Sequence, residues 1–208
     1  MGLIFSRKRA AKNISASAKP RRSSATAIGV CATLFASLSI GPYAYAQLAA
    51  SEYEVKAAYL YNFGKFVVWP EKSAPRQGES FEICVLGEDP FGSALDSAVL
   101  GETIGGKGVA IKRISKPQDM GNCRVLFIST SEAAGLPEIL ATLDKASVLT
   151  VSDMPQFSQR GGMIEFVLDG NRVRFEVNVT NAEDAGLNLS AALLKVAVRV
   201  TRNAHSGM

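Results

Sequence analysis

Short apolar segments that alternate with helical segments are the feature that most constrains the fold of this chain. Four segments, at 81–86, 109–114, 124–128 and 148–151, are apolar over most of their length. Helices predicted at 91–100 and 136–143 lie between successive members of this set. Strands that are apolar on both faces are typical of a parallel sheet covered by helices on both sides. The sequence therefore predicts an α/β fold, a three-layer α/β/α sandwich with a mostly parallel sheet.

Three further elements are predicted at the ends of this pattern. An amphipathic helix is expected from Ser51 to about Val68, where Trp69-Pro70 stops it, since the residue before proline avoids the α region. Apolar and polar residues alternate in 164–168 and in 173–177 on either side of Asp169-Gly170, which predicts an antiparallel hairpin that extends the sheet. The apolar stripe of 189–201 predicts a closing helix.

The first 46 residues have the three parts of a secretory signal peptide. Basic residues precede an apolar stretch from Ala25 to Ile40, and the small-residue pattern Ala44-Tyr45-Ala46 follows it. The stretch is shorter than the roughly 20 residues of a transmembrane helix. We therefore expect cleavage after Ala46 and a single exported domain over 47–208, with a folded core of about 51–202 and no membrane insertion after cleavage.

Cleavage reverses the net charge of the chain. The whole sequence has 23 Lys and Arg against 19 Asp and Glu, and seven basic but no acidic residues lie in 1–46. The mature domain then has 16 against 19, a net charge of −3. The basic pI belongs to the leader, so composition gives no argument for a nucleic-acid partner.

Two cysteines, Cys84 and Cys123, remain in the mature domain. Both stand in predicted neighbouring strands, and an even number of cysteines in an exported protein favours a disulfide. A pair of buried free thiols or a metal site are the alternatives. A metal site needs more ligands than two cysteines, and the single histidine, His205, lies in the C-terminal tail.

Catalytic patterns are weak in this sequence. With His205 in the tail, no Ser-His-Asp or Cys-His arrangement is expected inside the fold. Two carboxylates, Asp153 and Glu165, are the candidates for an unrecognised hydrolase, because carboxylates leave no pattern of their own. We interpret the chain as a protein that is not an enzyme, with no catalytic residue, metal or cofactor.

Two features in and near the hairpin are candidates for binding. Gly161-Gly162-Met163 is typical of a tight bend, and the alternative is a bare backbone surface kept for a ligand or partner. Arg172 and Arg174 lie on one face of a hairpin strand. They are either solvated or placed to hold a carboxylate or phosphate.

Three motifs, in order, resemble the YfiR family of periplasmic proteins. Residues 61–70, YNFGKFVVWP, match the family signature YNFxKFVxWP. The Gly-Gly-Met-Ile block at 161–164 with VRFEVN at 173–178 matches a later block. GLNLS at 186–190 with LLK at 193–195 resembles the family ending GLxxSxxLLKLA. The resemblance covers about Ser51 to Val200.

This resemblance implies a function that the patterns alone do not. Family members are periplasmic repressors that bind the periplasmic sensor domain of an inner-membrane, YfiN-like diguanylate cyclase and hold it inactive. An outer-membrane, YfiB-like lipoprotein sequesters the repressor, which raises cyclic di-GMP and promotes biofilm. The family fold is an α/β/α sandwich that forms homodimers, and Cys84 and Cys123 resemble its structural disulfide. Some members have a second disulfide near the Gly-Gly motif, where this chain has Ser158 and Glu165.

The expected contact residues follow from these motifs. We expect Trp69, Pro70, Gly161, Gly162, Met163, Arg172 and Arg174 to contact the partner or a ligand. Phe63, Phe66 and Leu193 are expected to be packing residues. The alternative function is a module that senses a small periplasmic molecule through a pocket above the carboxyl ends of the parallel strands and reports to another membrane signalling protein.

Overall fold

The computed structural model describes residues 43–71, 78–144 and 146–202, with side chains from Glu52 onward. Its helices and strands, in chain order, are α1 (Tyr43–Phe66), β1 (Val67–Val68), β2 (Phe81–Leu86), α2 (Ser93–Val99), β3 (Thr103–Ile104), β4 (Lys107–Ile114), β5 (Cys123–Ile128), α3 (Leu136–Thr142), β6 (Leu149–Ser152), β7 (Ile164–Asp169), β8 (Arg172–Asn178), α4 (Val179–Asp184), β9 (Asn188–Leu189), α5 (Ala191–Val196) and β10 (Arg199–Thr201). Most of the predicted leader lies outside the described residues, so cleavage after Ala46 stays a prediction.

The main sheet has eight strands in the order β10-β8-β7-β6-β5-β2-β4-β3. Strands β4, β2, β5, β6 and β7 run parallel to one another, β3 is antiparallel to β4, and β7 and β8 form the antiparallel hairpin. The hairpin turn is Gly170-Asn171, one residue later than predicted, because Asp169 is paired with Arg172. The predicted mostly parallel sheet with a hairpin extension is confirmed.

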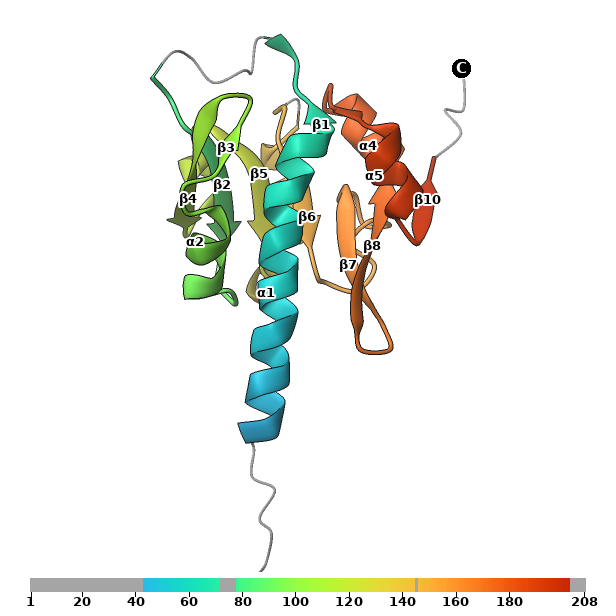
Figure 1. Ribbon diagram of the computed structural model, residues 1–208. Coiled ribbons are helices and arrows are strands. Elements are labelled where there is room, and N and C mark those ends of the chain that lie inside the picture. The colour runs from blue at the N-terminus through green and yellow to red at the C-terminus, as the bar shows by residue number, and fades with distance from the viewer. Residues whose placement is uncertain (1–42, 72–77, 145, 203–208) are drawn as a thin grey trace, which may run out of the picture. The chain divides into compact units, whose positions relative to one another are not determined.

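Helices cover both faces of this sheet, which makes three layers. Helix α1 crosses one face, and α2 lies beside it over β2 and β4 (Figure 1). One hydrophobic core lies on this face and includes Leu60, Phe63, Phe127 and Phe175. A smaller core on the other face packs α3 and Phe157 against β2 and β5. The two cores explain why the strands are apolar throughout.

The helix predicted from Ser51 to about Val68 ends earlier than expected. Helix α1 ends at Phe66, and Val67–Val68 form the short strand β1, which pairs with β9. The two β-branched residues before Trp69-Pro70 favour extended backbone.

The predicted closing helix over 189–201 is wrong in its second half. Helix α5 ends at Val196, and β10 runs parallel to β8, with Val200 opposite Val177. Alternating valines at 196, 198 and 200 fit a strand as well as a helix. The open edge of β8 selects the strand, because the Val198 N–H donates to the Phe175 carbonyl at 2.9 Å.

Candidate partner-binding surface

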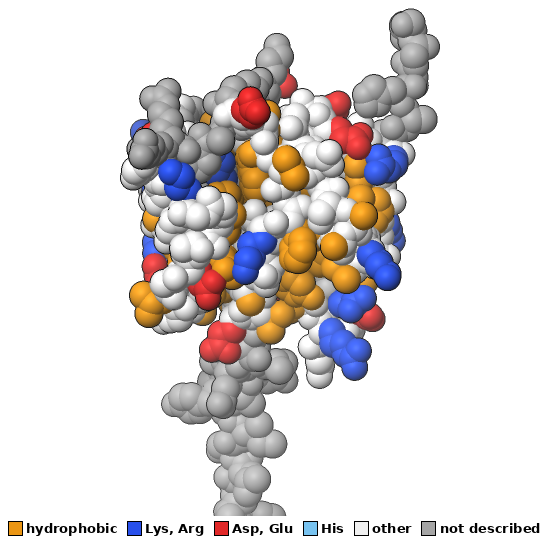
Figure 2. All heavy atoms as spheres, turned by 45° about the horizontal axis from the view of Figure 1, so that its top comes forward, with side chains coloured by type: hydrophobic (Ala, Val, Ile, Leu, Met, Phe, Trp, Pro, Cys, Tyr) orange, Lys and Arg blue, Asp and Glu red, His pale blue; other side chains and the backbone are white. Residues whose placement is uncertain are grey.

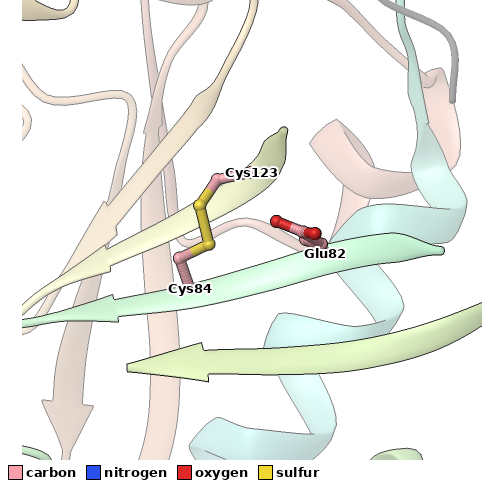
Figure 3. A group of neighbouring side chains, drawn as sticks. All are labelled: Glu82, Cys84 and Cys123. Carbon is pink, nitrogen blue, oxygen red and sulfur yellow. A yellow bond between two sulfur atoms is a disulfide. The ribbon is translucent and has the colours of Figure 1, made fainter. Parts of the chain in front are cut away.

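Cys84 and Cys123 form a disulfide between the neighbouring parallel strands β2 and β5. Their Cα atoms are 5.9 Å apart, and both residues are fully buried. Glu82 points toward the two sulfurs from β2 (Figure 3). Because both sulfurs are bonded to each other, this group offers only one carboxylate to a metal ion. The pair is therefore structural, and the alternatives of free thiols and a metal site are excluded for it.

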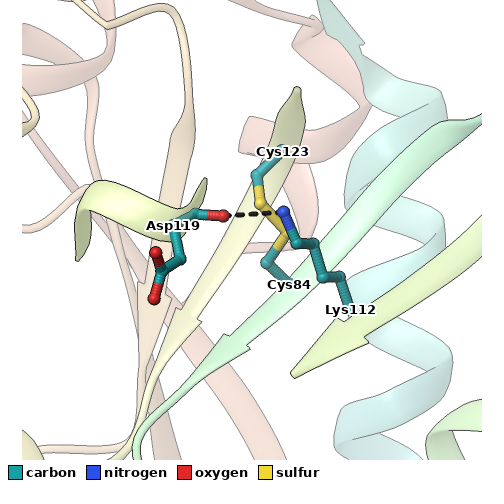
Figure 4. The surroundings of a disulfide bond; sticks show 4 residues. All are labelled: Cys84, Lys112, Asp119 and Cys123. Carbon is teal, nitrogen blue, oxygen red and sulfur yellow. Dashed lines mark hydrogen bonds between the residues drawn. A yellow bond between two sulfur atoms is a disulfide. The ribbon is translucent and has the colours of Figure 1, made fainter. Parts of the chain in front are cut away.

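A lysine covers the disulfide on the side of β4. Lys112 Nζ donates to the Asp119 carbonyl at 2.7 Å, so the aliphatic part of its side chain passes beside the bridge (Figure 4). Reductants therefore reach the sulfurs only when this part of the fold opens.

Asp153, at the carboxyl end of β6, is bound to helix α1. Its Oδ2 accepts hydrogen bonds from Tyr53 Oη at 2.8 Å and from Lys56 Nζ at 2.6 Å. Lys56 is buried and also pairs with Glu52 at 2.5 Å. Burial and the bond to Asp153 raise the pKa of Tyr53 far above its usual range. All of these groups are engaged with one another, so Asp153 fastens α1 to the sheet.

Glu165, the other candidate carboxylate, serves a loop on the opposite face. It accepts hydrogen bonds from the backbone N–H groups of Gln156 and Ser158 and from Ser158 Oγ, at 2.8 to 3.0 Å. These bonds hold the turn in which Gln156 has a φ of 62°. Asp153 and Glu165 have no common partner and do not form a pair for acid–base chemistry.

The Gly161–Met163 segment is a tight bend before β7. Gly161 has a φ of 106°, and a Cβ on Gly162 would lie 2.1 Å from the Phe157 ring. The backbone of Gly162 is fully used, because its N–H donates to Phe157 and its carbonyl accepts from Asn181 Nδ2 at 2.8 Å. Both glycines are thus required by backbone geometry and packing.

Arg172 and Arg174 lie at the far end of the hairpin from that bend. They line a hollow of about 400 Å³ together with Glu52, Val55, Tyr59 and Leu168. Arg174 Nε is buried without an acceptor. The structure therefore brings the two arginines to α1, and it separates them from Gly161–Met163.

A second hollow adjoins the first and is more apolar. It measures about 440 Å³ and is lined by Tyr59, Asn62, Phe63, Phe66, Phe175, Ala192, Leu193 and Val196, which we call the apolar groove. Tyr59 belongs to both hollows. Figure 2 shows hydrophobic side chains gathered across this face, with Lys and Arg side chains along one side.

Phe66 was expected to be a packing residue, and this expectation is wrong. Phe63 and Leu193 are buried, but Phe66 is 41% exposed and Val196 is 55% exposed. Val55, Tyr59 and Phe66 belong to the same apolar stripe of α1 as Phe63, so the sequence gives no separate signal for the groove. Contiguous exposed apolar side chains of this kind mark interaction surfaces.

Trp69 and Pro70 lie at the amino-terminal edge of the parallel strands. Trp69 is half-buried and packs edge-on against Phe81, with ring centroids 5.2 Å apart. Pro70 packs near Gly186, which has a φ of 76°. These two residues are therefore separate from the apolar groove and from Arg172.

Within the described residues, no helix combines the length and the apolar character needed to cross a bilayer. The structure contains a disulfide, and disulfides form and persist mainly in oxidising compartments. The carboxylates of Asp153 and Glu165 hold neighbouring segments of the fold together, and the hollows lie on the surface of this α/β domain. Residues 53–198 match the model of one family, described as YfiR/HmsC-like, and the chain belongs to this family. The family is regulatory rather than catalytic.

The solved structures that match part of this chain are distant from it. A conserved domain protein from Vibrio cholerae has 12% identity and a TM-score of 0.45, and the match covers 58% of this chain and 54% of that one. An ABC domain in complex with L-Trp from Streptococcus pneumonia also has 12% identity, with a TM-score of 0.43 and coverage of 58% and 55%. The chain thus spans just over half the length of these proteins.

Proposed function

We propose that this protein is a periplasmic repressor that binds the periplasmic sensor domain of an inner-membrane diguanylate cyclase and holds it inactive. Membership of the YfiR/HmsC-like family supports a role in cyclase signalling. Export through the predicted leader and the buried disulfide fit the periplasm. The domain acts by contact and needs no cofactor or catalysis.

The apolar groove is the observation that carries this proposal. Phe66 from α1 and Val196 from α5 are both exposed and line this groove, and Tyr59 joins it to the hollow that Arg172 and Arg174 line. An apolar centre with arginines at the border has the composition of a protein interface. Aromatic residues and arginine are also the residue types that contribute most to binding energy.

Repression then follows from differential affinity. A protein that binds the inactive state of the cyclase more tightly than the active state shifts the population toward the inactive one. A lipoprotein of the outer membrane that binds the repressor removes it from this equilibrium and releases the cyclase. Cyclic di-GMP and biofilm formation are then low while the repressor is free.

The first test is intracellular cyclic di-GMP in a strain that lacks the gene, with and without the exported domain returned. We expect a rise on deletion and full reversal by the wild-type domain. Val196→Asp places a charge in the apolar groove and is expected to abolish reversal. Leu100→Asp is the matched control, because Leu100 is 84% exposed just after α2, which lies at the other end of the sheet from α5 (Figure 1).

Two outcomes oppose the proposal. If the intracellular level of cyclic di-GMP does not change when the gene is deleted, under conditions where the wild-type strain makes the protein, cyclase repression is contradicted. Reversal by Val196→Asp equal to that by Leu100→Asp removes the groove from the mechanism. Light scattering on the same variants tests the predicted homodimer, and it separates loss of a dimer from loss of cyclase binding.

A further inference from the structure

A separate pocket lies at the amino-terminal edge of the parallel strands, where α1 ends. It has a volume of about 400 Å³. Its lining residues are Gly64, Lys65, Val67, Val68, Trp69, Phe81, Ile104, Gly105, Lys107 and Arg124. This volume is in the range of small-molecule sites. The pocket shares no lining residue with the apolar groove, so ligand binding in the pocket does not depend on the proposed function.

Two of its side chains carry buried donors without an acceptor. Trp69 Nε1 and Arg124 Nε are each buried and have no hydrogen-bond partner among the residues that the structure describes. Arg124 as a whole is only 9% exposed. A buried donor without a partner is unfavourable, and native proteins rarely keep one without a reason. Two such donors around one pocket indicate that an acceptor group belongs there.

The charge of the lining points to an anion. Lys65, Lys107 and Arg124 are cationic, and the lining includes no carboxylate among the described residues. Burial lowers the pKa of Arg124, and the charges of Glu79 and Glu82 oppose this only in part. An anion in the pocket would therefore offset the cost of burying the guanidinium.

The remaining walls are apolar and close together. Trp69 and Phe81 meet edge-on, and Ile104 stands opposite the end of α1. Gly64 allows this close approach, because a Cβ there would lie 2.6 Å from Ile104 Cδ1. The pocket thus combines apolar rings with a pair of N–H donors, a combination that suits a compact acid with a hydrocarbon or aromatic body.

We propose that this pocket binds the carboxylate of a small apolar organic acid, with Arg124 and Trp69 as the hydrogen-bond donors. Lys65, which is exposed, also lines the pocket and adds electrostatic attraction. The apolar body of the acid lies against Trp69 and Phe81.

The single tryptophan makes a direct test possible. Trp69 is the only one in the chain, so its emission reports on this pocket alone. The oxidised protein is titrated with phenylacetate and with hexanoate, and we expect a saturable change in emission and a rise in melting temperature. Phenylacetamide tests the need for charge, and inorganic phosphate tests whether an anion without an apolar body is enough.

Variants assign the binding to the named residues. Arg124→Gln is expected to weaken phenylacetate binding about tenfold or more, since it removes a charge-assisted bond. Arg172→Gln in the hairpin hollow is the matched control and should bind normally. If Arg124→Gln does not fold, Lys65→Gln takes its place, with a weakening of about threefold because its charge is solvated.

The proposal is overturned by no saturable response to either acid, by equal binding of phenylacetamide, or by phosphate alone producing the same response. Equal affinities of wild type and Arg124→Gln would also overturn it. Saturable binding of the acids that is lost in Arg124→Gln and kept in Arg172→Gln supports it.

Discussion

Reduction of the Cys84–Cys123 disulfide is the perturbation whose cost can be worked out from the structure. The bridge joins residues 39 apart in sequence. In the chain-entropy model, a closed loop of this length stabilises the folded state by about 4 kcal/mol, because it restricts the unfolded chain. Reduction removes no heavy atom from the core, so loss of the cross-link is the main change. A loss of this size is a large part of the stability of an ordinary domain, which is roughly 5–15 kcal/mol.

The assay is equilibrium unfolding in urea of the oxidised and the reduced protein, followed by Trp69 emission and by circular dichroism. The free energies come from linear extrapolation. Cys84→Ala/Cys123→Ala is the control, since the reductant must leave its unfolding curve unchanged. If the free energies of unfolding of the oxidised and the reduced protein agree within about 1 kcal/mol, the loop-entropy argument is refuted.

Two more predictions follow from local contacts. Gly162→Ala is expected to cost about 3 kcal/mol in urea unfolding, because the new Cβ would lie 2.1 Å from the Phe157 ring, while Gly108→Ala, in open space, should change stability by no more than about 0.5 kcal/mol. An equal loss in both variants would contradict this packing argument. Burial and the bond to Asp153 raise the pKa of Tyr53, so the unfolded tyrosine ionises first and the free energy of unfolding should fall as the pH rises above about 10. Urea unfolding at several alkaline pH values measures this slope, and an unchanged slope in Tyr53→Phe would disprove the contribution of Tyr53.

The sheet was predictable from the sequence because its strands have a strong local signal. Strands such as Val125–Ile128 are apolar at every position, and the alternation in the hairpin leaves one register that buries Phe166 and Phe175 together. The closing segment was not predictable, because valines at alternate positions fit both helix and strand. Its structure depends on the edge of β8, which is a tertiary feature.

The binding surfaces were predictable only in part. The signature residue Trp69 led to the pocket at the end of α1, and Arg172 and Arg174 led to the hairpin hollow. No local pattern distinguishes Phe63, which is buried, from Phe66, which is 41% exposed, because both fit one apolar stripe. Likewise Arg124 lies inside an apolar strand, and only the assembled sheet shows that its Nε has no acceptor.

Strand β10 has a consequence for how this protein is made and handled. Arg199–Thr201 is the last described strand of the chain, yet it covers the edge of β8 in the main sheet. Until these residues join the sheet during folding, the hairpin presents an unpaired edge that a second, partly folded chain can join. A shortened gene that ends before Arg199 should therefore yield aggregates. A purification tag should be placed after Arg202, where it does not interrupt the pairing of β10 with β8.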